Sequence, residues 1–148
     1  MKLSTKGRYG LRALVDLTVH SSKGHQPLAQ IAERQNISEI YLEQVFATLR
    51  KNGVVKSIKG AQGGYLLNVE PANITVGKVL RILEGDLSIV DEKVKSDSEE
   101  KSVAQCVYKN VWEKIDKNIN ELVDSITLEE LVEDYKKNHG MLPHMYHI

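Results

Sequence analysis

The sequence predicts a mainly α-helical protein with one small β-hairpin, in which a winged helix-turn-helix domain precedes a long helix. Residues 27–45 have the pattern of a short helix, a turn and a second helix, and a glycine-rich hairpin follows at residues 59–65. Residues 102–124 form an amphipathic segment with a wide apolar face. Winged-helix proteins place one helix in the major groove and the hairpin against the DNA. We therefore predict a winged helix-turn-helix DNA-binding domain plus a long dimerisation helix.

Local signals mark the first three helices. The first is expected to begin after Ser4 or Thr5, either of which can cap it. Pro27 opens the second helix, where its missing N–H does no harm. Ser38 caps the third helix and Gly53 ends it. The core face of the third helix has the spacing of one helical stripe. It consists of Leu42, Val45, Phe46 and Leu49.

A hairpin and a fourth helix complete the amino-terminal part of the chain. Residues 54–58 and 65–67 are rich in strand-forming residues and are separated by a loop with three glycines. Residues 75–83 return to helical spacing. We therefore expect residues 1–85 to form the DNA-binding domain.

Beyond residue 85 the sequence changes character. Residues 86–102 are acidic with little apolar periodicity, which predicts a flexible loop. Residues 103–137 should hold the long helix and a short last helix, capped by Ser125 or Thr127, before a tail at 138–148. A helix of this length with such a wide apolar face needs a partner. The predicted dimerisation stripe is Val103, Val107, Val111, Ile115, Ile119 and Leu122.

Charge is distributed unevenly, although the formal net charge of the 148 residues is zero. Residues 1–70 hold ten Lys/Arg and five Asp/Glu, a net charge of +5, and residues 71–148 hold the balancing −5. Phosphate binding needs local positive charge, and the positive half also carries the helix-turn-helix. Ordinary scatter between the halves is the alternative explanation.

Bulk features indicate a cytoplasmic protein without membrane contact. No apolar run approaches the roughly 18 residues of a membrane span. The amino terminus lacks the apolar core of a signal peptide. The single cysteine, Cys106, excludes an intramolecular disulfide framework.

Candidate DNA contacts lie on the third helix and on the hairpin. Polar side chains at the amino end of a recognition helix reach base edges, where Glu43 can accept from cytosine and Gln44 can pair with adenine. Glycines let the hairpin backbone approach phosphate, and lysine adds charge. A solvated helix face and an ordinary tight turn are the alternatives. The candidates are Ser38, Tyr41, Glu43 and Gln44, with Lys56, Lys59, Gly60, Gly63 and Gly64 on the hairpin.

Four motifs together resemble the Rrf2 (Rrf-two) family of bacterial winged-helix regulators. They are Lys-Gly-Arg-Tyr-Gly at 6–10, Tyr-Leu-Glu-Gln at 41–44, Leu-Arg-Lys-Asn-Gly at 49–53 and the hairpin at 59–65. The resemblance spans nearly the whole chain. It implies a homodimer with crossed long helices, and therefore a pseudo-palindromic operator in double-stranded DNA. It also implies DNA contacts from Ser38, Tyr41, Glu43, Gln44 and Lys59.

Cluster-binding members of that family carry three cysteines before the long helix, and only Cys106 matches one of them. A [2Fe–2S] cluster needs four protein ligands. We therefore expect no cofactor and no metal site, unless a partner chain or the distant His20 and His25 supply ligands. Cys106 could instead sense oxidants or thiols. The alternative is a small buried apolar residue.

The carboxyl terminus resembles the tail of the cluster-free, cysteine-metabolism branch of the family. Tyr146 and Ile148 end the chain with an aromatic ring, an apolar side chain and a carboxylate. In that branch the partner is cysteine synthase, which recognises tails ending in isoleucine. The resemblance thus implies cysteine synthase as a partner. A frayed end, or one packed back on the dimer, is the alternative.

The combined prediction is a sequence-specific, dimeric repressor of bacterial transcription that controls genes of cysteine or sulfur metabolism. An iron–sulfur or redox-sensing regulator of the same fold is the alternative, and an interaction subunit that binds no DNA is the third hypothesis. The sequence contains no nucleophile–base pairing, and the glycines of the hairpin do not open a helix as a phosphate loop would. We therefore expect no catalytic residues.

Overall fold

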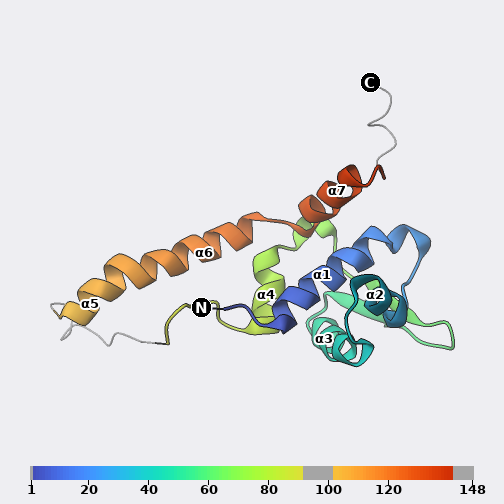
Figure 1. Cartoon of the computed structure of the whole chain (residues 1–148), viewed down its shortest axis with the longest axis horizontal. Helices are drawn as coiled ribbons and strands as arrows, with labels where there is room; N and C mark the ends of the chain where they lie inside the picture. Colours follow the sequence, from blue (N-terminus) through green and yellow to red (C-terminus); the bar gives the residue numbers. More distant parts are fainter. Residues whose placement is uncertain (1, 92–101, 142–148) are drawn as a thin grey trace, which may run out of the picture.

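The amino-terminal domain is built around its first helix. The computed structural model describes residues 2–91 and 102–141, and in it α1 packs against α2, α3, α4 and α7 (Figure 1). The helices, in chain order, are α1 (Thr5–Val19), α2 (Leu28–Gln35), α3 (Glu39–Lys51), α4 (Val76–Glu84), α5 (Val103–Val107), α6 (Glu113–Ser125) and α7 (Leu128–Asn138). Short 3₁₀ turns lie at Ser21–Lys23 and Pro71–Asn73.

Polar caps fix the starts of four of these helices. At α5 the Ser102 hydroxyl accepts the Gln105 N–H at 3.0 Å. The Ser38 hydroxyl accepts the Tyr41 N–H at 3.3 Å, and the Thr75 hydroxyl accepts the Lys78 N–H at 3.1 Å. Of the two candidates for the last helix, Thr127 is the cap, because its hydroxyl accepts the Glu130 N–H at 3.2 Å. Each cap satisfies a backbone donor that the helix itself leaves unpaired.

The first helix begins directly after Ser4, as predicted, but the Ser4 side chain makes no capping hydrogen bond to it. Ser4 occupies the cap position, but its hydroxyl donates to the Glu84 carboxylate at 2.6 Å. The same Glu84 oxygen accepts the N–H groups of Ser4 and Gly7, both at 2.9 Å. A carboxylate from the end of α4 therefore caps α1, where it also opposes the positive end of the helix dipole. This contact joins residues about 80 positions apart.

The hairpin consists of β1 (Val55–Ile58) and β2 (Gly64–Leu67), paired antiparallel with Val55 opposite Leu67 and Ile58 opposite Gly64. Gln26, just before α2, extends it. The Gln26 N–H donates to the Tyr65 carbonyl, and the Tyr65 N–H donates to the Gln26 carbonyl, each at 2.9 Å. The hairpin is therefore attached to the helix-turn-helix along its outer edge.

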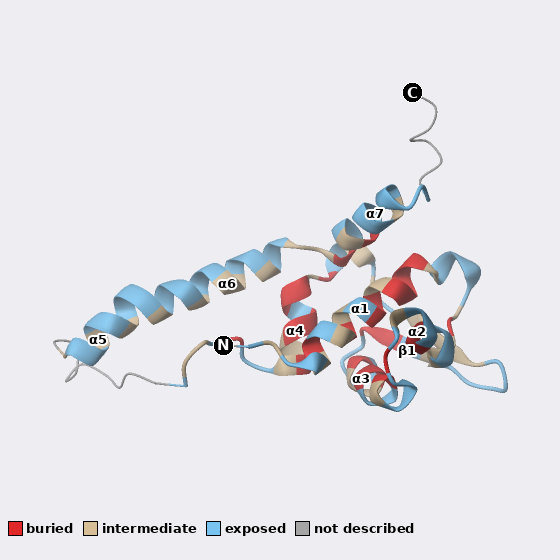
Figure 2. Cartoon of the chain, in the orientation of Figure 1, coloured by how far each residue is buried: buried red, intermediate tan, exposed pale blue. Residues whose placement is uncertain are grey.

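One apolar core holds α1, α2, α3, α4, α7 and the hairpin together (Figure 2). The predicted stripe of α3 lies inside it, with each of the four residues at most 1% exposed. The Phe46 ring lies 5.0 Å from the Tyr65 ring and so joins α3 to β2. The largest fully buried side chains include Leu14, Leu17, Ile31, Leu42, Phe46, Leu49, Ile74 and Leu128.

The long carboxyl-terminal helix extends away from this core (Figure 1). It was predicted as one regular helix, and the structure instead inserts a π-helical segment, Tyr108–Trp112, between α5 and α6. In a regular α-helix, residues four apart are rotated by about 40° beyond a full turn. The wider π-helical turn offsets part of this rotation, so the four-residue spacing from Val103 to Ile119 stays closer to one face. The described residues form no helix long and apolar enough to cross a membrane.

The segment after α4 is packed where the sequence predicted a flexible loop. Leu87 is 5% exposed and packs with Val76 and Leu80. The Asp116 carboxylate on α6 accepts the Ile89 N–H at 2.9 Å. Residues 86–91 are therefore attached to the folded body, and residues 92–101 of the predicted loop lie outside the described residues.

An ion pair anchors the base of the long helix to the domain. Arg81 on α4 donates to Asp124 on α6 at 2.7 Å and to the Asn120 side chain at 2.6 Å. The hydrogen bond from Arg81 lowers the pKa of Asp124 below its usual value. The pair is largely exposed, so it fixes the direction of α6 more than it stabilises the fold.

Candidate nucleic-acid interface

The turn between α2 and α3 sets the direction of the third helix. Asn36 adopts the left-handed conformation with φ of 55°, which ends α2. Ser38 then caps α3 two residues later. The buried stripe of α3 fixes its rotation about its own axis, so the residues on its outer face are determined by helical geometry.

The centre of that outer face lies opposite the buried stripe. At about 100° per residue, the positions directly opposite the stripe follow i, i+4, i+7 and i+11 spacing. They are Ile40, Gln44, Ala47 and Lys51. We call them the recognition face. Of the predicted contacts, Gln44 lies on this face, and Ser38 and Glu43 are exposed beside it.

Tyr41 differs from the other predicted contacts on α3 because it is half-buried. Its hydroxyl is 3.0 Å from the Thr5 hydroxyl, and its ring meets the Tyr9 ring edge-on at 6.1 Å. Tyr41 therefore holds the amino end of α1 against α3. Thr48 is also half-buried, with its hydroxyl donating to the Gln44 carbonyl at 3.2 Å.

The hairpin exposes both predicted lysines, Lys56 and Lys59. Its glycines are also required by the backbone conformation and by close backbone contacts. Gly60 has φ of 121°, which other residues rarely adopt. At Gly64 a Cβ atom would lie 2.5 Å from the Gln26 carbonyl oxygen, and Gly63 has a similarly close approach to Ile58. The tight turn accounts for Gly60 and Gly63, and the close approach of the Gln26 backbone accounts for Gly64, without any ligand.

His25, which the sequence suggested only as a distant cluster ligand, ties the hairpin loop to the domain. Its Nε2–H donates to the Gln62 carbonyl at 2.5 Å. Together with the Gln26–Tyr65 pairing, this hydrogen bond limits how far the loop carrying Lys59 can move. No local sequence signal identifies it, because the two residues are 37 positions apart.

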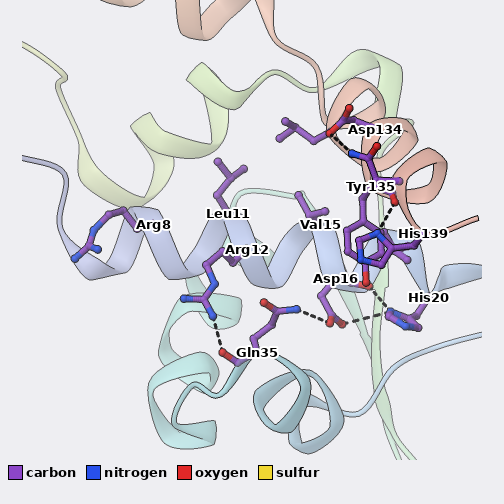
Figure 3. Close-up of a pocket in the computed structure, with 13 residues that line it drawn as sticks. Arg8, Leu11, Arg12, Val15, Asp16, His20, Gln35, Asp134, Tyr135 and His139 are labelled. Carbon is purple, nitrogen blue, oxygen red and sulfur yellow. Dashed lines mark hydrogen bonds and ion pairs between the residues drawn. The ribbon is translucent and has the colours of Figure 1, made fainter.

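A buried charge network lies behind the interface and beside a groove between α1 and α7 (Figure 3). Asp16, with 2% of its side chain exposed, receives two parallel hydrogen bonds from Arg34, the shortest at 2.6 Å, and one from Gln35 at 2.9 Å. The Asp16 hydrogen bond raises the pKa of Arg34 above its usual value. Arg34 also donates to the buried Gln26 at 3.2 Å, so the network joins α1, α2 and the hairpin edge.

The groove itself has a volume of about 430 Å³. Arg8 and Arg12 line its α1 side, and Tyr135, stacked on His139 at 4.0 Å, lines its α7 side. The Arg12 guanidinium lies over the Tyr9 ring, 5.2 Å from its centre, and donates to the Gln35 carbonyl at 2.5 Å.

Cys106 is exposed on α5, with the Asn110 amide 3.7 Å from its sulfur. The alternative of a buried apolar residue therefore does not hold within this chain. In residues 2–91 and 102–141, no three His, Cys, Asp or Glu side chains gather as they would around a metal ion.

The predicted dimerisation stripe is largely uncovered in the single chain. Val103 is 81% exposed and Leu122 61%, while Val107, Val111 and Ile115 are each exposed by 37–39%. Ile119 is half-buried. Side chains of this size on one helix face are typical of a surface that another chain covers. The tail residues Tyr146 and Ile148 lie outside the described residues.

Comparison with known proteins agrees with this geometry. The Rrf2 family model, described as an iron-dependent transcriptional regulator, matches residues 3–134. The chain is 44% identical to the HTH-type transcriptional regulator CymR of Bacillus subtilis (strain 168) over 131 residues, which cover 88% of this chain and 89% of CymR.

Two solved structures resemble both the sequence and the fold. T. potens IscR has 47% sequence identity and a TM-score of 0.74, over 93% of this chain and 90% of its own. CymR, named the global cysteine regulator of B. subtilis, has 42% identity and a TM-score of 0.75, over 90% of this chain and 97% of its own.

Proposed function

This chain belongs to the Rrf2 family of DNA-binding transcriptional regulators and is not an enzyme. From that premise we propose that it is a homodimeric, sequence-specific repressor. It acts in the cytoplasm on genes of cysteine or sulfur metabolism. The observation that carries the proposal is the capped and rigidly seated α3, whose outer face is exposed beside a lysine-bearing hairpin. Two such units related by a two-fold axis read a pseudo-palindromic operator.

The test of specific binding is selection from random-sequence double-stranded DNA, followed by gel shifts with the selected sequence. We expect two inverted half-sites whose centres are an integral number of helical turns apart. Equal and weak binding to every sequence at physiological salt would contradict a specific repressor.

Lys59→Ala should weaken binding to all DNA sequences by a similar factor. An exposed lysine on the hairpin contacts phosphate, which carries no sequence information. Removing one lysine–phosphate interaction should lower the slope of log affinity against log salt by about one. Fluorescence anisotropy over a salt series measures both quantities. Lys137→Ala, an exposed lysine at the end of α7, is the matched control and should leave the slope unchanged.

The absence of a bound cluster is part of the proposal. The only cysteine is Cys106, and in the part of the chain that the structure describes it belongs to no group of three or more His, Cys, Asp or Glu side chains that could hold a metal ion. The similarity to IscR favours the alternative, an iron–sulfur sensor. Visible absorption of protein purified without oxygen separates the two: a colourless protein supports the repressor without a cluster, and a red-brown one supports the sensor.

The sequence of the tail supports cysteine synthase as a partner. Met145, Tyr146 and Ile148 supply apolar side chains close together, and a peptide that ends in such residues can be captured by a pocket that binds its carboxylate through backbone N–H groups. A peptide of residues 139–148 should bind cysteine synthase in a calorimetric titration, and the peptide without Ile148 should not. Equal binding by both peptides, or no binding by either, would remove this partner from the proposal.

A further inference from the structure

Ile40 is the large apolar side chain on the recognition face, where the other apolar residue is the small Ala47. It is 72% exposed, more than any other large apolar residue in the described part of the amino-terminal half, where Ile58 follows at 37%. It is the second residue of α3, after Glu39, so it lies in the first turn, where recognition helices contact bases. An isolated exposed isoleucine needs no explanation on an ordinary surface. On the recognition face, however, its position brings it close to the base edges when α3 lies in the major groove.

The neighbours of Ile40 leave it free to contact DNA. The apolar stripe proposed for the dimer lies on α5 and α6, and the core face of α3 is on the opposite side of the helix. Ile40 forms part of the wall of a shallow hollow of about 450 Å³ together with Ser38, Tyr41 and Gln44. Thr5 and Tyr9 of α1 complete its wall, so the hollow lies between the starts of α1 and α3.

The major groove offers one apolar group to such a side chain. Among the base edges only thymine presents a methyl group, and apolar side chains contact it. Gln44 lies one helical turn further along, about 6 Å in axial rise, which corresponds to about two base pairs at 3.4 Å each. Its amide suits adenine. Ile40 and Gln44 together therefore favour A·T pairs within a short stretch of each half-site.

We propose that Ile40 contacts the 5-methyl group of a thymine in the major groove of each half-site and thereby makes that position specific for thymine. This rests on the proposed function, since it requires a specific operator. It assigns to Ile40 a role in discrimination that is separate from the phosphate contacts of the lysines.

Replacing single thymines by deoxyuridine tests the contact directly, because uracil lacks only the methyl group. The probe is the operator that the unmodified protein selects from random DNA, with each thymine replaced in turn and symmetrically in both half-sites. At one thymine position the substitution should weaken binding by about fourfold per half-site, the value expected for one buried methyl group. The Ile40→Ser variant should bind the thymine and uracil operators equally at that position.

Two controls separate this contact from general effects. Lys51→Ala, on the same face of α3, should weaken binding but keep the full uracil effect. Because Ile40 is exposed, Ile40→Ser should unfold at the same urea concentration as the unmodified protein. A repeated selection with Ile40→Ser should lose the preference for thymine at that one position.

The outcomes distinguish the two levels of the proposal. If the unmodified protein selects an operator but uracil has the same effect on it and on Ile40→Ser at every position, the role of Ile40 is overturned and the repressor proposal stands. If no sequence is selected at all, both are overturned.

Discussion

Ile115→Asp is expected to leave the protein monomeric and to reduce operator binding by about a hundredfold or more. Ile115 lies in the middle of the exposed stripe on α5 and α6. Each apolar side chain buried there contributes about 1.5–3 kcal/mol, and a two-fold interface buries each one twice. The aspartate places a charge in this interface. A monomer then loses the increase in DNA affinity, a factor of about 10²–10⁴, that linking two recognition units provides.

Light scattering coupled to size-exclusion chromatography measures the assembly state, and gel shifts measure operator binding. Lys114→Asp changes the charge at the adjacent exposed position of α6 and should remain dimeric with nearly unchanged affinity. A monomeric unmodified protein at micromolar concentration would disprove the proposed interface.

Arg34→Ala should lower the free energy of unfolding by about 1.5–3 kcal/mol, the range for hydrogen bonds to a charged group, because Arg34 is partly exposed and Gln35 keeps its hydrogen bond to Asp16. Asp16 is almost fully buried, and the two parallel bonds from Arg34 supply the charge that compensates it. Arg34 also donates a hydrogen bond to the Gln26 side chain, so the same change should weaken the attachment of Gln26 at the edge of the hairpin.

Urea unfolding followed by circular dichroism measures this decrease. The double variant Asp16→Asn, Arg34→Met removes both charges and should be destabilised clearly less than Arg34→Ala alone. Arg50→Ala, an exposed arginine on α3, is the control and should change stability by no more than about 0.5 kcal/mol. If Arg34→Ala were as stable as this control, Asp16 would not depend on Arg34.

The sequence predicted those parts of the fold that local interactions determine. Ser38 caps the third helix as predicted, Thr127 is one of the two caps predicted for the last helix, and the buried stripe of α3 is the predicted one. The misses involve distant residues. The cap from Glu84, the pairing of Gln26 with Tyr65 and the packing of Leu87 all join segments that only the folded chain brings together.

The same division applies to the candidate interface. Helical spacing was enough to identify Gln44, and it would also have identified Ile40, since both lie opposite the buried stripe. Ile40 was not among the predicted contacts because only polar side chains were considered as partners for the bases. The half-buried position of Tyr41 could not be predicted, because it depends on contacts with Thr5 and Tyr9 on another helix.

The four-residue spacing on the long helix also determines how two copies can meet. Heptad zippers repeat every 3.5 residues and wind around each other in a left-handed coiled coil, whereas repeats longer than 3.6 residues favour the right-handed sense. The stripe from Val103 to Ile119 repeats every four residues and includes a π-helical turn. Two such helices would therefore not wind around each other as a left-handed heptad zipper does. A leucine-zipper helix from another protein would find no matching stripe here, and the surface thus favours pairing with a second copy of this chain.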